Sequence, residues 1–213
     1  MGIQVAPDDT IWFAEQFANY LGHYFPATGR YQLYPLPWLS IPDSAHPGQV
    51  RRLSSAPNEL ALDAQGQVWF TESGTNRLGR LDPATGAMHL FAAPDPHALL
   101  MEIASDAQGS IWVTSFTPGL LFRLQPGTGT FTSYVTSVQG SGRSALYGLL
   151  VTPAGEVWVT MLAENALARL DVAAQRFLTY PLPRPNSQPL GLVMDASHTL
   201  WFTGVDAVGM LRL

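Results

Sequence analysis

Residues 66–72 read Gly66-Gln67-Val68-Trp69-Phe70-Thr71-Glu72, and the tryptophan phrase at their centre returns four more times in the chain. The other copies are Ile11-Trp12-Phe13, Ile111-Trp112-Val113, Val157-Trp158-Val159 and Leu200-Trp201-Phe202. The tryptophans of the last four copies follow one another after 43, 46 and 43 residues, whereas Trp12 and Trp69, in the first two copies, are 57 residues apart. A recurring period of this length indicates a repeat architecture with one insertion in its first unit.

Each repeat contains four short segments with the character of β-strands. An apolar run and a glycine-containing turn precede the tryptophan segment, and a third segment such as Leu78-Gly79-Arg80-Leu81 follows it. The fourth segment alternates, as in Phe177-Leu178-Thr179-Tyr180. The β-branched and aromatic residues favour strands, and the glycine turns favour hairpins. Four strands per repeat predict the blades of an all-β propeller, with four complete blades and a three-stranded fifth.

The predicted blades form one domain over residues 2–58, 59–101, 102–147, 148–190 and 191–213, and the insertion covers residues 38–57. We expect the tryptophans to be structural and to pack between neighbouring blades, because one blade cannot bury both faces of its sheet. The final blade lacks a fourth strand, so the two chain ends cannot share a blade. An unclosed ring leaves apolar faces and a free edge. We therefore expect either a truncated chain or a homo-oligomer that closes the ring.

Composition excludes several classes of partner and site. The formal charge is −5, with 11 basic residues that are all arginine, so neither nucleic acid nor an anionic membrane is an expected partner. Cysteine is absent, which excludes disulfides and thiolate metal sites. No apolar run approaches a spanning helix. No export signal is visible at the N-terminus, so the default expectation is a cytoplasmic protein.

The repeat phrase has a family resemblance. Residues 68–72, followed by residues 76–81 and by Pro83-Ala84-Thr85-Gly86, resemble the repeat of streptogramin B (virginiamycin B) lyases. Tyr180-Pro181-Leu182-Pro183 resembles that family's linker into the next blade. The resemblance implies a seven-bladed, monomeric enzyme that opens the ester ring of a cyclic depsipeptide antibiotic by elimination. It also implies a histidine base and a magnesium ion that stabilises the enolate-like charge.

The implied histidine would stand just before an innermost strand, and no repeat has one there. The five positions hold Met1, Asn58, Met101, Tyr147 and Leu190. Tyr147-Gly148-Leu149 matches a phrase in which the family has a substrate-contacting tyrosine; the alternative is a rim tyrosine that closes a blade junction. His97 is out of register, because it lies five residues before Glu102. The catalytic residue is therefore unknown.

Three further residues are candidates for binding. Glu15 and Glu72 end tryptophan strands and could face a central channel, where two carboxylates could hold magnesium; capping and surface roles are the alternatives. Residues 57–63 are similar to a phrase of calcium-dependent lactonase propellers in which the asparagine is a metal ligand. Asn58 is therefore a candidate binding residue, together with Tyr147.

Three functions remain open at this stage. The first is a streptogramin-lyase-like propeller that lacks the catalytic histidine and acts as a binding or self-assembling scaffold, with a small-molecule ligand as a possible partner. The second is an active, magnesium-dependent carbon–oxygen lyase on cyclic depsipeptides. The third is a metal-dependent, lactonase-like hydrolase. Fold alone does not decide among them.

Overall fold

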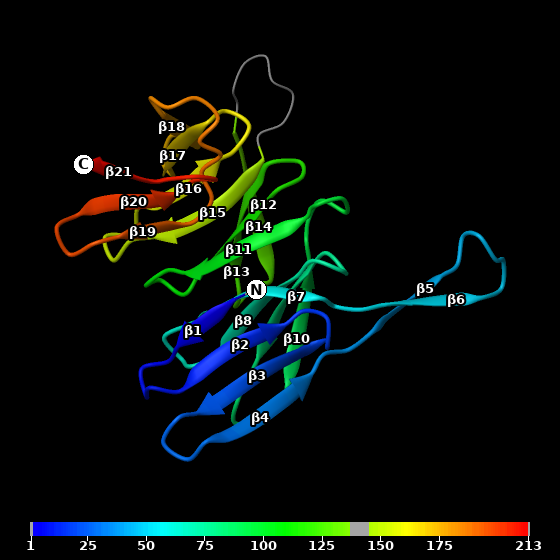
Figure 1. Ribbon diagram of the computed structural model, residues 1–213. Helices are drawn as coiled ribbons and strands as arrows, with labels where there is room; N and C mark the ends of the chain where they lie inside the picture. The colour runs from blue at the N-terminus through cyan, green and yellow to red at the C-terminus, as the bar shows by residue number, and fades with distance from the viewer. Residues whose placement is uncertain (1, 137–144, 213) are drawn as a thin grey trace. The chain divides into compact units, whose positions relative to one another are not determined.

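The computed structural model describes residues 2–136 and 145–212, which form strands and turns and contain no helix (Figure 1). The strands form four four-stranded antiparallel sheets, one three-stranded sheet and one two-stranded hairpin. Each larger sheet pairs its strands in chain order. This arrangement confirms the predicted all-β fold with four complete blades and a three-stranded fifth. In the described residues, no helix has the length and apolarity that crossing a membrane requires.

The chain divides into two compact units, residues 1–93 and residues 94–213. The N-terminal unit contains blade 1, a hairpin and blade 2. Blade 1 is built from β1 (Ile3–Val5), β2 (Ile11–Glu15), β3 (Tyr20–Phe25) and β4 (Arg30–Pro35). The hairpin is β5 (Leu39–Pro42) and β6 (Val50–Leu53). Blade 2 is built from β7 (Pro57–Leu62), β8 (Val68–Glu72), β9 (Arg77–Leu81) and β10 (Met88–Ala92).

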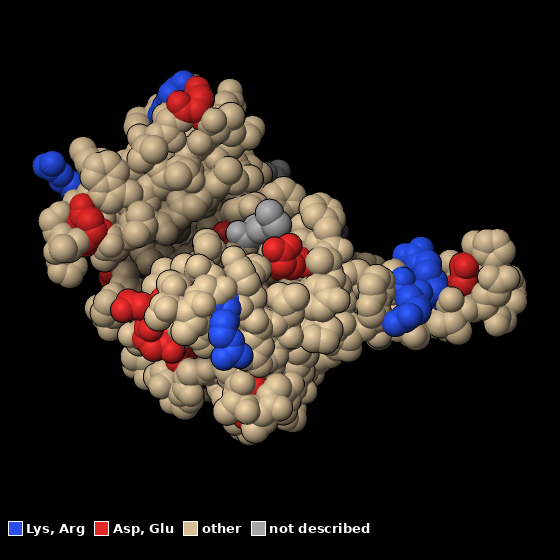
Figure 2. All heavy atoms as spheres, turned by 60° about the horizontal axis from the view of Figure 1, so that its bottom comes forward, with Lys and Arg blue, Asp and Glu red and all other residues tan. Residues whose placement is uncertain are grey.

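The hairpin is the insertion that the sequence predicted between the first two repeats. It extends away from both sheets of its unit (Figure 1). Figure 2 shows basic side chains on it, where the sequence places the exposed Arg51 and Arg52. Two strands alone bury little apolar surface, and Val50 is accordingly exposed.

The C-terminal unit contains blades 3, 4 and 5. Blade 3 is built from β11 (Leu100–Ser105), β12 (Ile111–Ser115), β13 (Leu120–Gln125) and β14 (Thr130–Val135). Blade 4 is built from β15 (Leu146–Val151), β16 (Val157–Met161), β17 (Ala166–Asp171) and β18 (Arg176–Pro181). Blade 5 is built from β19 (Leu192–Met194), β20 (Thr199–Thr203) and β21 (Val208–Arg212).

The tryptophans form the cores between neighbouring blades of each unit. Trp12 of blade 1 lies in one cluster with Leu60, Val68 and Phe70 of blade 2. Trp112 joins the cluster of blade 4, and Trp158 packs with Leu200 and Phe202 of blade 5. Within a unit, each of these tryptophans therefore packs on the next blade. Removing one such side chain costs about 3–5 kcal/mol of unfolding free energy.

Hydrogen bonds and cation–π contacts fix the orientation of most of the repeated indole rings. Trp69, Trp112 and Trp201 each donate a hydrogen bond of 2.8 Å to an aspartate six residues earlier. An arginine of the third strand lies over the ring of Trp69, Trp112 and Trp158, at 5.1–5.8 Å from the centroid. Such cation–π contacts stabilise the ring's position. Blade 1 differs, because His23 replaces the arginine and stacks on Trp12 at 3.9 Å.

Asparagines hold the linkers that leave the outer strands. Asn19 and Asn165 occupy the turn after the tryptophan strand in a left-handed conformation, with φ of 62° and 52°. Asn19 donates to the carbonyl of Leu36 at 2.9 Å, and Asn165 donates to the carbonyl of Arg184 at 2.8 Å. Asparagine tolerates this backbone conformation better than most residues. The same residue therefore shapes the turn and clamps the linker.

Candidate functional site

The innermost strands of blades 2, 3 and 4 share an irregularity at their start. The register shifts between Pro57 and Leu60 in β7, and the same shift occurs between residues 100 and 103 of β11 and between residues 146 and 149 of β15. The residues inside these bulges include Asn58, Met101 and Tyr147. Bulges re-aim side chains and are common beside functional sites. Three of the positions where the family resemblance implies a histidine therefore lie in a bulge.

A threonine of the neighbouring strand supports each bulge. The Oγ1 atoms of Thr71, Thr114 and Thr160 accept hydrogen bonds of 3.1, 3.2 and 2.7 Å from backbone amides in the bulges. Because the bulge leaves an amide outside the regular ladder, the hydroxyl satisfies a donor that would otherwise be unpaired. The tryptophan strand thus determines the shape of the innermost strand at this end.

Tyr147 lies at the junction of blades 3 and 4 in the C-terminal unit. Its carbonyl accepts a hydrogen bond of 2.6 Å from the Thr114 hydroxyl, which belongs to the preceding blade. Thr160 donates in the same way to the carbonyl of Leu190 at 3.0 Å. The backbone of Tyr147 therefore closes a blade junction. Its side chain is half-buried, and the substrate-binding role stays a prediction.

Asn58 has the corresponding place in the N-terminal unit. Its carbonyl accepts a hydrogen bond of 2.6 Å from the amide of Gly2, which joins blade 1 to blade 2. The neighbouring Glu59 is largely buried, and burial raises the pKa of its carboxyl above the usual range. The side chain of Asn58 is half-buried, and its binding role stays a prediction. Met1, the first of the five histidine positions, lies outside the described residues.

Glu15 and Glu72 lie at the ends of neighbouring tryptophan strands, and the residues that follow them are linked by a hydrogen bond from Gln16 to Ser73 at 3.3 Å. Their environments differ sharply. Glu15 is exposed, whereas the side chain of Glu72 is 0% exposed and pairs with Arg77 Nε at 2.7 Å. The hydroxyl group of Thr75 also donates to Glu72.

The two candidate ligands therefore lie in different environments, and their magnesium-binding role stays a prediction. A buried carboxylate that pairs with an arginine has its charge compensated within the protein. Among the described residues, no three histidine, aspartate or glutamate side chains gather closely enough to hold a metal ion. The structure therefore gives no geometry from which a metal-dependent step follows.

No histidine lies within the bulges of blades 2, 3 and 4. His23 is 9% exposed, and its Nε2 lies 2.8 Å from the Thr10 hydroxyl. Burial lowers the pKa of His23 below its usual value. The other four are exposed residues of turns, the hairpin or an outer strand: His46, His89, His97 and His198.

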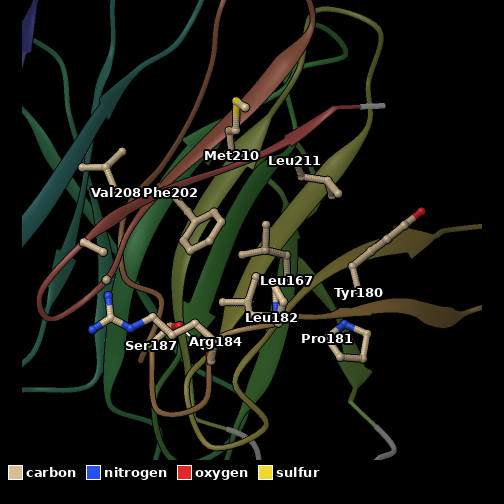
Figure 3. Close-up of a pocket in the computed structure, with 14 residues that line it drawn as sticks. Leu167, Tyr180, Pro181, Leu182, Arg184, Ser187, Phe202, Val208, Met210 and Leu211 are labelled. Carbon is tan, nitrogen blue, oxygen red and sulfur yellow. Dashed lines mark hydrogen bonds between the residues drawn. The ribbon is translucent and has the colours of Figure 1, made fainter.

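Sequence reasoning missed one concave surface in the C-terminal unit. A groove of about 320 Å³ runs along β21 and the linker after β18 (Figure 3). Its wall is mainly apolar, with Leu167, Leu182, Phe202 and Leu211 directed into or along it. The described part of blade 5 has three strands, and the groove lies beside the third of them, β21.

Comparisons with solved structures support the fold. The chain aligns over its full length with a catalytically inactive virginiamycin B lyase from Staphylococcus aureus with quinupristin, at TM-score 0.83 and 22% identity. A streptogramin B lyase gives TM-score 0.81 at 21% identity, again with 100% of this chain covered. The chain covers 66% and 68% of those two chains. A gluconolactonase from Xanthomonas campestris gives TM-score 0.69 at 15% identity, with 99% of this chain and 71% of that chain covered.

Sequence comparison places the chain in a family. A search of curated protein sequences finds no match. The sequence model of the virginiamycin B lyase family, in contrast, matches residues 42–213, which leaves out only blade 1 and the start of the hairpin. This match covers well over half of the chain, and the chain therefore belongs to the virginiamycin B lyase family.

Proposed function

We propose that this chain is a streptogramin-lyase-like propeller that serves as a self-assembling scaffold and lacks the elimination activity. The observation that carries the proposal is a pair of exposed apolar sheet faces, one on blade 1 and one on blade 5. Each face matches one half of the blade junctions seen inside the units. Exposed apolar patches of this kind mark interaction surfaces.

Blade 5 presents the tryptophan half of a junction. The strand register aligns Val193, Trp201 and Met210 on one face of the sheet. These side chains are 59%, 37% and 52% exposed. In blade 4 the same face carries Trp158, which is fully buried because blade 5 covers it. The face of blade 5 lacks such a cover among the described residues.

Blade 1 presents the receiving half. The register aligns Ile3, Phe13 and Leu33 on the face opposite Trp12, and Ile3 and Leu33 are 65% and 54% exposed. In blade 2 the aligned positions pack in the cluster of Trp12, and they are Leu60, Phe70 and Leu90. The blade 1 face is therefore built to receive a tryptophan from a preceding blade.

A second copy of the chain provides the partner for each face. Because the two halves differ, the contact is head-to-tail, so blade 5 of one copy packs on blade 1 of the next. Such contacts form a ring if the rotation closes and a filament if it does not. Removing both apolar faces from water supplies the driving force.

The residues at the positions where the family resemblance implies a histidine support a role without the elimination activity. Asn58, Met101, Tyr147 and Leu190 have no imidazole that could remove a proton at neutral pH. The ion pair of Glu72 with Arg77 engages one of the two candidate metal ligands. An active lyase or a lactonase-like hydrolase would need a base and a metal site from other residues.

Light scattering over a concentration series tests the assembly. We expect a mass that is a multiple of 23.1 kDa, and we expect Trp201→Glu or Leu33→Glu to lower it. Phe17→Glu is the matched control, because Phe17 is 95% exposed in a turn outside both faces. Each face variant keeps one intact half, so a mixture of the two should form a dimer with one junction. A wild-type protein that is monomeric at all concentrations would overturn the proposal.

Incubation with quinupristin and magnesium tests the catalytic alternative. Elimination gives a linear isomer of the substrate, whereas ester hydrolysis adds one water, so chromatography with mass spectrometry separates the two outcomes. We expect the substrate to remain unchanged. A linear isomer would establish lyase activity, and a hydrated product would favour the lactonase-like alternative.

A further inference from the structure

We propose that a cavity at one end of blade 1 binds a small zwitterion, a free α-amino acid with an apolar side chain. The ammonium group of the ligand pairs with Asp8, its carboxylate pairs with Arg30, and its side chain lies on Phe25. The site does not rest on the assembly proposed above. Phe25 and Arg30 share the face of blade 1 that carries Trp12 and packs on blade 2, because they are aligned two positions beyond His23.

The first observation is the cavity itself, which has a volume of about 410 Å³. The turn between β1 and β2 forms one wall with Asp8 and Thr10. The start of β4 forms the other wall with Arg30 and Gln32. Phe25, at the end of β3, lies between the two walls, because β3 lies between β2 and β4 in the sheet. Pockets of roughly this size, about 300–1,000 Å³, hold small-molecule ligands.

The acidic wall presents a carboxylate that is held in place and still has a free oxygen. Thr10 donates to Oδ1 of Asp8 from its hydroxyl at 2.7 Å and from its amide at 3.2 Å. These hydrogen bonds lower the pKa of Asp8, the hydroxyl contributing most, so the carboxylate is ionised at neutral pH. Within the described ranges, Oδ2 of Asp8 accepts no hydrogen bond. An ammonium group can therefore bind there without displacing a protein contact.

The basic wall presents a guanidinium group without a partner. Across residues 2–136 and 145–212, the side chain of Arg30 makes no ion pair and no hydrogen bond. Arg30 and Asp8 line the same cavity but do not pair with each other, so their charged groups leave space for a molecule between them. A guanidinium group matches a carboxylate through two parallel hydrogen bonds. A ligand in the cavity thus meets opposite charges at its two ends.

Blade 4 has a smaller cavity at the same place in its sheet, with a volume of about 280 Å³. There Arg169, opposite the tryptophan, pairs with Glu156, two residues before it. The two charges neutralise each other within the protein. Blade 1 has His23 and Thr10 at these positions, and His23 Nε2 lies 2.8 Å from the Thr10 hydroxyl. The shorter, uncharged pair is consistent with the larger cavity and provides no internal partner for the charges on its walls.

The floor of the cavity determines which class of zwitterion fits. Phe25, Pro26 and Ala27 line it together. In blade 4 the position of Phe25 holds Asp171, so the apolar floor is specific to blade 1. An apolar side chain on this floor is removed from water, which favours binding. A charged side chain would lose hydration there without a partner. The ligand is therefore an amino acid with an aliphatic or aromatic side chain.

Titration with L-leucine, followed by amide NMR, tests the site. The host is the nitrogen-15-labelled Trp201→Glu variant, which leaves blade 1 unchanged and which the assembly proposal predicts to be smaller than the wild type; the wild type is measured in parallel. We expect saturable shifts of the Thr28 and Gln32 amides with a Kd of about 1 mM, because solvated charges contribute modestly. Isopentylamine is leucine without its carboxyl group, and isocaproate is leucine without its amino group. Each should bind at least about tenfold more weakly, since each loses one charged contact.

Three host variants test the assigned contacts. Asp8→Asn keeps an oxygen that accepts from Thr10 but removes the charge, and Arg30→Gln removes the guanidinium group. Each should weaken leucine binding at least about tenfold. Arg176→Gln is the matched control, because Arg176 has the register position of Arg30 in blade 4, and it should leave binding unchanged.

Three results would overturn the proposal. They are the absence of saturable shifts with leucine, equal affinity for leucine and its two analogues, and equal losses in Arg30→Gln and Arg176→Gln. None of these results depends on the mass measured by light scattering, so failure of this site and failure of the assembly are distinguishable.

Discussion

The same four residues occur at two places in the molecule and have different surroundings. Tyr34-Pro35-Leu36-Pro37 runs from the last strand of blade 1 into the linker after it, and Tyr180-Pro181-Leu182-Pro183 does the same after blade 4. The local hydrogen bonding is the same, because the amides of Leu36 and Leu182 each donate to the carbonyl of an asparagine at 2.9 Å. Burial differs, because the first linker faces a four-stranded blade and the second a three-stranded one. The neighbouring blade, and not the local sequence, determines how much each linker contributes to stability.

The largest expected difference comes from replacing a tryptophan on a covered sheet face and one on an exposed sheet face. Trp158 is 0% exposed under blade 5, whereas Trp201 is 37% exposed. We expect Trp158→Ala to lower the free energy of unfolding by about 3–5 kcal/mol. Trp201→Ala should cost about 1–2 kcal/mol, since part of its surface is already in water. Urea unfolding at low protein concentration measures both, and equal losses would contradict the role of the neighbouring blade.

The leucines of the two linkers give a smaller and better matched test. Leu36→Ala should cost about 2–4 kcal/mol, because it leaves a cavity in a closed cluster. Leu182→Ala should cost about 1 kcal/mol, because its side chain already borders the open groove. Unfolding midpoints in urea check the order.

The asparagine clamps should show no such difference between the two regions. Asn19 accepts a hydrogen bond from Ser54 at 2.9 Å, and Asn165 accepts one from the amide of Ser187 at 2.7 Å. We expect Asn19→Gly and Asn165→Gly to cost about 1–2 kcal/mol each, from lost hydrogen bonds alone. Glycine keeps the left-handed turn, so alanine variants at the same positions should cost more. A large difference in unfolding free energy between the two glycine variants would show that the two asparagines do not stabilise their linkers equally.

The sequence predicted the repeats well because one bulky residue marks every blade. The tryptophans, the glycine turns and the alternating outer segments were enough to predict four complete blades and a three-stranded fifth. The β5–β6 hairpin was predicted only as an insertion, because two exposed strands have no buried face to produce a strong pattern.

The candidate site was less predictable. Asn58 and Tyr147 were expected just before innermost strands, and the structure has them as the second residues of β7 and β15. The bulges that contain them depend on hydrogen bonds with Thr71 and Thr160, which no local pattern encodes. Glu72 was expected to face a channel. Its ion pair with Arg77 joins directly opposed residues of the β8–β9 hairpin, so it depends on the register that the intervening turn sets. The groove is lined by residues of both blade 4 and blade 5, so no single repeat could predict it.

The smallest expected effect concerns the third-strand position that holds His23 in blade 1 and Arg169 in blade 4. His23 is buried against Trp12, and its pKa lies below its usual value, chiefly through desolvation. The unfolded chain then binds the proton more readily than the folded chain. The stability that neutral His23 contributes is therefore complete above the unfolded pKa of about 6.5 and is lost as the pH falls below it.

We accordingly expect the urea midpoint of the wild type to be lower at pH 5.5 than at pH 7.5, and His23→Gln to reduce this slope. Glu59 acts in the opposite sense, because burial raises its pKa; its stabilising contribution is present at low pH and is lost as the pH rises. The difference between variant and wild type at each pH therefore isolates His23. An unchanged slope in His23→Gln would show that the imidazole on Trp12 does not titrate differently in the folded and unfolded chain.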